Sequence, residues 1–164
     1  MTASASPAPQ TYSRMQVILH WAIAALIVVQ LVYNGPIQAA FNDRLEGGQL
    51  AVGGGALVHI VLGSTVLGLA VIRLLIRLRR GAPPPHAGTP RIIALAGHLT
   101  HAALYLMIFA MPLTGLVAWF AGSEWAATLH EAGRLVFIVL IGLHVAGALV
   151  EQFVLRNNVF RRMA

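Results

Sequence analysis

Four long apolar segments, joined by short loops, make up most of this 164-residue chain. They cover residues 15–33, 51–76, 91–120 and 126–154, and glycines at 53–55 blur the start of the second. About 20 apolar residues of α-helix cross the hydrocarbon core of a bilayer. The first segment exceeds the roughly 7–15 residues of a signal-peptide core, which favours a span over a cleaved leader. The pattern predicts an all-α membrane protein, a four-transmembrane-helix bundle, with a kink at Pro112.

The composition supports one membrane domain. Hydrophobic residues make up 58% of the chain and charged residues 10%, whereas about a quarter of a soluble domain is charged. We expect a flexible tail over residues 1–13, the four-helix domain over 14–155, and a short basic tail over 156–164. The absence of cysteine excludes disulfides, thiolate metal sites and cysteine nucleophiles.

All eleven basic residues are arginines, and their positions predict the orientation of the bundle. Nine lie near the termini or the connector between the second and third segments, whereas Arg44 and Arg134 lie beside the other two loops. Arginine is enriched on the cytoplasmic side of membrane proteins, so we expect both termini in the cytoplasm. The membrane topology also explains the net charge of +6. The sequence contains no basic helix with interleaved aromatic residues, so it gives no sign of a nucleic-acid partner.

Six of the seven histidines fall within the apolar segments, where ionisable residues are costly and usually mark functional sites. His130 and His144 are fourteen residues apart, so they leave one helix face about 21 Å from each other. Depths estimated from the helical rise place His59 beside His130 in an outer layer. His144 belongs to an inner layer, and its partner there is left open: His20 or a third-segment histidine, His98 or His101. Among the third-segment histidines, depth slightly favours His98, because His101 lies one turn deeper.

Two histidines that face each other across a bundle suit axial ligation of a haem iron by neutral imidazoles. Zinc fits less well, because closed zinc sites normally need four ligands and no carboxylate joins either layer. Small residues near the histidines would let a macrocycle approach, although they also serve helix packing: Gly63, Gly133, Gly142 and Gly147. The third-segment histidines share one helix face and suit a quinone site, a proton relay or a hydrogen bond to a haem propionate.

Four stretches carry a resemblance to a known family. They are YSRMQVILHW at 12–21, VHIVLGSTVLGLAVIRLLIRL at 58–78, GHLTHAALYLMIFAMPLTGLV at 97–117 and LHEAGRLVFIVLIGLHVAGAL at 129–149. With them the chain resembles the bacterial cytochrome b561 family of four-helix, di-haem b membrane proteins, especially its short members that act as superoxide oxidases. The same pattern also occurs in cytochrome b anchor subunits of respiratory hydrogenases and formate dehydrogenases.

The resemblance implies two haem b groups in a multi-pass protein of the bacterial inner membrane. It pairs His20 with His144 for the inner haem iron and His59 with His130 for the outer one. It gives the two third-segment histidines, His98 and His101, a supporting role. The chain departs from the family near the end of the fourth segment: Glu151 and Gln152 stand where superoxide-oxidising members can carry paired histidines. If those histidines serve the quinone, the quinone site differs in this chain.

We therefore expect an oxidoreductase of the respiratory chain that takes electrons from superoxide outside and delivers them to ubiquinone. Arg44 and Arg134 are the external cations available to attract the superoxide anion. The inner arginines near the haem edges, Arg14, Arg73 and Arg77, could pair with propionates, although topology is the simpler explanation for most of them. The alternative is an electron-conducting anchor for a peripheral dehydrogenase or hydrogenase. The short loops disfavour it, because a docking partner needs roughly 800 Å² of surface per side. A metal or proton carrier is a third reading, and the oligomeric state, including a homo-oligomer, is left open.

Overall fold

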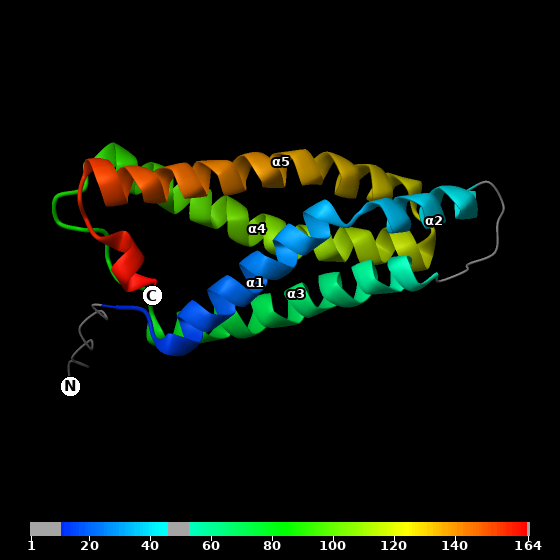
Figure 1. Cartoon of the computed structure of the whole chain (residues 1–164), viewed down its shortest axis with the longest axis horizontal. Helices are drawn as coiled ribbons and strands as arrows, with labels where there is room; N and C mark the ends of the chain where they lie inside the picture. The colour runs from blue at the N-terminus through cyan, green and yellow to red at the C-terminus, as the bar shows by residue number, and fades with distance from the viewer. Residues whose placement is uncertain (1–10, 46–52, 164) are drawn as a thin grey trace, which may run out of the picture.

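The structure, a computed structural model, describes residues 11–45 and 53–163 (Figure 1). Its five α-helices are α1 (Arg14–Val32), α2 (Gly35–Leu45), α3 (Gly54–Arg80), α4 (Arg91–Ala121) and α5 (Glu124–Leu149). A π-helical turn, η1 (Val150–Val154), continues α5, and a short 3-10 helix, η2 (Val159–Arg162), follows. The described residues include no strand. Four helices are long and apolar enough to cross a membrane, namely α1, α3, α4 and α5 with η1, which confirms the predicted four-span, all-α architecture.

Capping residues fix several of the helix ends. Ser13 and Gln16 form a capping box at the start of α1, with each side chain bonded to the backbone N–H of the other. The Ser123 hydroxyl accepts a hydrogen bond from the Ala126 N–H and begins α5. Gly122, with φ of 64°, ends α4 in the left-handed conformation that glycine adopts without strain. These local signals explain why the predicted segments agree closely with the observed helices.

Helix α2 was not predicted. The sequence interpretation took Gly35 and Pro36 as the end of the first span and the following residues as a loop, but helix resumes at Gly35. Proline is tolerated in the first turn of a helix, where its missing N–H would have no intrahelical partner. Tyr33 and Asn34 thus separate α1 from α2, and the Gly-Pro pair starts the second helix.

The bundle consists of two antiparallel pairs, α1 with α3 and α4 with α5, which meet mainly through α3 and α4 (Figure 1). Two glutamines tie α1 to the α3 region. The Gln16 amide donates to the Gly81 carbonyl at 3.1 Å, and the Gln30 amide donates to the His59 carbonyl at 2.9 Å. Buried side chains of all four long helices form the interior: Gln16, Leu19, Ile23, Ala56, Val66, Ala70, Ala118, Trp119, Ala126 and Phe137.

Both described chain ends lie at the same end of the bundle, which we call the terminal end (Figure 1). The Trp21 indole N–H donates to the Met163 carbonyl at 2.9 Å, so the last residues reach back to α1. The opposite end, called the far end, carries α2 and the turn from α4 to α5. An even number of spans accounts for this arrangement, and the arginine distribution predicts that the terminal end faces the cytoplasm.

Candidate functional site

The far-end layer brings His59 of α3 and His130 of α5 together. Their ring centroids are 6.3 Å apart and their planes are inclined by 72°. Two metal–imidazole bonds of about 2.0–2.1 Å, together with the distance from each nitrogen to its ring centre, require centroids roughly 6.3 Å apart. The two rings are therefore separated by the distance that one shared metal ion requires.

The ring of His130 is oriented by α4. Its Nδ1 donates to the Met111 carbonyl at 2.8 Å, which leaves Nε2 as the nitrogen with a lone pair for a metal. Gly115 permits this approach: a Cβ at that position would lie 3.0 Å from the His130 Cε1 atom and 3.1 Å from Nδ1. The sequence analysis did not identify this support, although a proline and a glycine three residues apart inside an apolar span were its visible signal.

His59 has a different environment. Its Nδ1 is buried and has no hydrogen-bond partner among the described residues, with the Tyr33 backbone nearby. A metal-bound imidazole usually donates its other N–H to a carbonyl or carboxylate, and the Tyr33 carbonyl is the available acceptor. Burial of an unpaired ring nitrogen is costly. A hydrogen bond from Nδ1 to the Tyr33 carbonyl would remove this cost and leave Nε2 as the nitrogen for a metal.

At the terminal end, His144 of α5 contacts two histidine rings. Its centroid lies 6.0 Å from that of His20 on α1 and 5.0 Å from that of His101 on α4. The Nδ1 of His101 is already bonded to the Gly97 carbonyl at 2.7 Å. His98 is exposed, and its Nδ1 bonds to the Ala94 carbonyl one turn earlier in the same helix.

The stagger of α4 explains why His101 rather than His98 reaches this layer. The depth estimate placed Arg91 level with the start of the first span and so favoured His98. In the structure the Arg77 guanidinium, close to the end of α3, lies 5.5 Å from the ring centroid of Tyr105, well inside α4. The start of α4 therefore extends beyond the end of α3 at the terminal end (Figure 1).

The donor set distinguishes between kinds of metal site. No group of three or more histidine, aspartate or glutamate side chains that could hold a metal ion occurs among residues 11–45 and 53–163. A closed zinc site needs four protein ligands, whereas a haem iron takes four bonds from the macrocycle and leaves two axial positions. Facing pairs of imidazoles fit the haem.

The four glycines proposed to admit a macrocycle fall into two groups. A Cβ at Gly63 would lie 2.9 Å from the Gln30 Nε2 atom, and one at Gly133 would lie 2.7 Å from the Met111 Sδ atom. These two glycines serve contacts between helices. Gly142 and Gly147, before and after His144 in the sequence, are exposed and have no atom within 4 Å of an added Cβ, so neither serves a contact between helices.

The candidate external cations are only partly described. Arg134 is exposed on α5, one turn after His130, and interacts electrostatically with it. Arg44 lies in the last turn of α2 at the far end, and its side chain is outside the described part of the structure. Glu46, counted among the external acids, is also outside the described residues.

Glu151 has a structural role at the terminal end. In η1, its carboxylate accepts hydrogen bonds from the Thr89 hydroxyl, at 3.2 and 3.3 Å, and from the Asn157 amide. The neighbouring Gln152 side chain accepts from the Phe160 N–H at 3.1 Å, and Arg162 donates to the Pro84 carbonyl at 3.0 Å. The C-terminal segment is thereby folded onto the connector between α3 and α4.

Comparison with known proteins identifies the family. The model of the prokaryotic cytochrome b561 family matches residues 11–164. The chain belongs to that family. It is 32% identical over 152 residues to a cytochrome b562 of Cereibacter sphaeroides, covering 93% of this chain and 94% of that protein.

Two further proteins are also similar in sequence to this member of the cytochrome b561 family. The Yersinia pestis protein named "Probable superoxide oxidase CybB" is 26% identical over 177 residues, covering 93% of this chain and 94% of that protein. An Escherichia coli protein named cytochrome b561 homolog 1 is 25% identical over 173 residues, covering 93% and 96%. The chain is thus a membrane cytochrome of a haem b-binding, electron-transferring family, as the sequence motifs predicted.

Proposed function

We propose that this cytochrome carries electrons across the bacterial inner membrane through two haem b groups. His20 and His144 would hold the inner haem at the terminal end, and His59 and His130 the outer haem at the far end. The proposal depends on two distances between ring centroids, 6.0 Å in the inner pair and 6.3 Å in the outer pair, and one ring of each pair belongs to α5. Bound haem supplies the one-electron chemistry, and the protein supplies its placement.

The chain's own residues define the route. Fourteen residues of α5 separate the two ligand layers by about 21 Å along the helix. In both layers one ring comes from the α1–α3 pair and the other from α5, so each haem would also join the two halves of the bundle. The Met111 carbonyl and Gly115 orient the His130 ring, and the Tyr33 carbonyl is available to accept from His59.

The donor and acceptor we propose are superoxide and ubiquinone. Two superoxide anions each give up one electron and become dioxygen, while one ubiquinone takes both electrons and two protons to become ubiquinol. The name of the Yersinia pestis relative supports this reaction. Arg134 would attract superoxide to the far end, next to His130, and the arginine-rich terminal end would face the cytoplasm.

Stopped-flow mixing tests the donor. Superoxide is expected to reduce the purified cytochrome, and added ubiquinone is expected to reoxidise it. Superoxide dismutase, added before mixing, is the control and should abolish the reduction. A cytochrome that dithionite reduces but superoxide does not would contradict the proposed donor and would favour an electron conduit that serves a partner dehydrogenase.

The support of His130 by α4 gives a prediction about outer haem binding. Gly115→Val is expected to weaken it by about 10–100-fold, the usual range for changes beside a metal ligand, because the new side chain displaces the His130 ring. Gly97→Val is the matched control on the same helix, where an added Cβ meets no atom within 4 Å. Haem content after purification measures both, and equal losses in the two variants would contradict the role of Gly115.

A further inference from the structure

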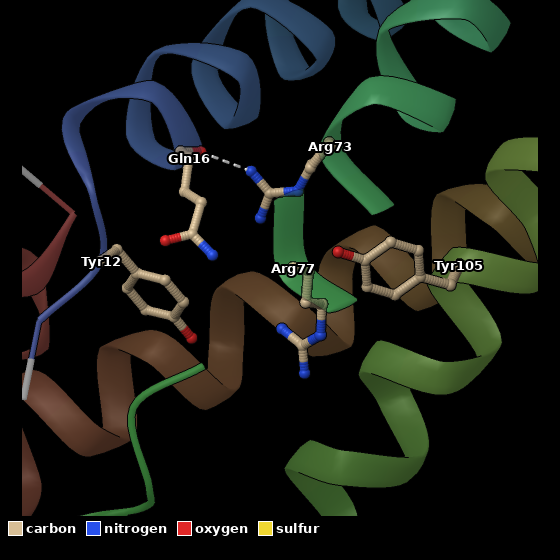
Figure 2. A pocket seen from close by; sticks show the side chains of 5 residues that line it. All are labelled: Tyr12, Gln16, Arg73, Arg77 and Tyr105. Carbon is tan, nitrogen blue, oxygen red and sulfur yellow. Dashed lines mark hydrogen bonds between the residues drawn. The ribbon is translucent and has the colours of Figure 1, made fainter. Parts of the chain in front are cut away.

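A narrow, polar recess lies at the terminal end between α1, α3 and α4 (Figure 2). Tyr12 and Gln16 line it from the start of α1, Arg73 and Arg77 from α3, and Tyr105 from α4. Figure 2 shows both guanidinium groups between Tyr12 and Gln16 on one side and Tyr105 on the other. Two cations thus face one recess inside the spanning part of the bundle.

Several hydrogen-bond donors in the recess have few partners or none among the described residues. Arg73 donates through Nη1 to the Gln16 carbonyl at 2.7 Å, and Arg77 stacks over the Tyr105 ring. The Tyr105 hydroxyl is buried and has no hydrogen-bond partner within the described ranges, 11–45 and 53–163. A buried hydroxyl normally finds a partner, because leaving it unpaired costs about 1–3 kcal/mol. The recess therefore offers several donors, and no carboxylate is among the residues that line it.

No carboxylate of the described residues forms an ion pair with either arginine. Asp43, Glu124 and Glu131 lie on α2 and the first turns of α5, at the far end. Glu151, at the terminal end, is bonded to Thr89 and Asn157. Charged groups inside a membrane protein usually pair with one another or with backbone carbonyls. Arg73 has one such carbonyl, that of Gln16, and a guanidinium group matches a carboxylate best. A bound group is thus the natural source of the missing anion.

The recess adjoins the inner pair of proposed ligands. Gln16 lies one turn before His20 on α1, and Tyr105 lies one turn after His101 on α4. Arg73 interacts electrostatically with the rings of His20 and His144. An anion bound by the two guanidinium groups would therefore lie beside the inner haem, and haem b carries two propionate carboxylates.

We propose that Arg73 and Arg77 bind the propionates of the inner haem and that the Tyr105 hydroxyl donates a hydrogen bond to one of them. The proposal rests on the bis-histidine inner haem described above. It gives the two arginines a role beyond the charge asymmetry that orients the bundle.

Redox titration of Arg73→Gln and Arg77→Gln tests the pairing. Loss of a cation beside the haem disfavours the reduced state, so the reduction equilibrium of the inner haem should fall about tenfold, which is about 59 mV for one electron. Arg79→Gln is the matched control, since Arg79 is exposed in the last turn of the same helix. Neither the control variant nor the outer haem should shift.

Resonance Raman spectroscopy gives a second measurement that does not depend on activity. Tyr105→Phe keeps the ring under Arg77 and removes one hydrogen-bond donor, so the propionate bending band should shift while both haems are retained. This variant keeps the proposal testable if an arginine variant loses its inner haem. Equal potential shifts in Arg79→Gln, or an unchanged propionate band in all three recess variants, would overturn the proposal.

Two further outcomes separate the competing explanations. Loss of bound phospholipid from the arginine variants, with an unchanged propionate band, would assign the recess to a lipid phosphate and overturn the propionate pairing. A wild-type protein without haem would refute the proposed function and the pairing with it. A wild-type protein with two haems whose variants do not shift would refute the pairing alone.

Discussion

His130→Ala is expected to remove the outer haem and leave the inner haem in place, lowering the haem content from two per chain to one. His59→Ala should have the same effect, because each ring supplies one of two axial bonds in the far-end pair. The inner ligands lie about 21 Å away along α5, so their haem should keep its spectrum and potential. Pyridine haemochrome assays against protein concentration measure the content.

His98→Ala is the matched control for these variants. His98 is exposed, bonds within its own helix and contacts neither proposed pair, so both haems should remain. Loss of both haems from His59→Ala or His130→Ala, in a protein that still folds by circular dichroism, would contradict the assignment of two separate layers.

His20→Ala is expected to remove the inner haem, whereas His101→Ala should keep both haems. The His101 and His144 centroids are 5.0 Å apart, which is less than the roughly 6.3 Å that two metal–imidazole bonds require. The His20 and His144 centroids, at 6.0 Å, are close to that value and lie on opposite halves of the bundle.

Electron paramagnetic resonance distinguishes the two inner partners. A low-spin bis-imidazole signal from the inner haem should persist in His101→Ala and disappear from His20→Ala. The reverse pattern would make His101 the axial ligand and His20 its neighbour. The family resemblance and the ring separations both favour His20, so these two variants test the inner assignment directly.

Much of the fold could be predicted from the sequence because the spans are long and apolar. Segment ends agreed with the helices where local signals are strong, as at Ser13, Ser123 and Gly122. Helix α2 was missed because a Gly-Pro pair, taken as the end of one helix, was not recognised as the start of another. Glycines before α3 likewise concealed where that helix begins.

The site was harder to predict than the fold because it depends on how the helices are staggered. Spacing within α5 correctly placed His130 and His144 on one face, since both belong to one helix. Depths on different helices can be compared only when the helices begin at the same level in the membrane. Because α4 extends past α3, His101 lies in the inner layer instead of His98, which the depth estimate had favoured. For Arg73 and Arg77 the sequence left propionate pairing open beside topology, and only the tertiary structure places both residues in one recess with Tyr105.

The haem content of the purified wild-type chain tests the central claim most directly. A reduced-minus-oxidised absorption spectrum, combined with a pyridine haemochrome assay, should show b-type haem at two equivalents per chain. The two haems should titrate as separate components, because their ligand layers have different surroundings. A single equivalent, or a purified and folded chain with no b-type band, would contradict two bis-histidine sites on α5.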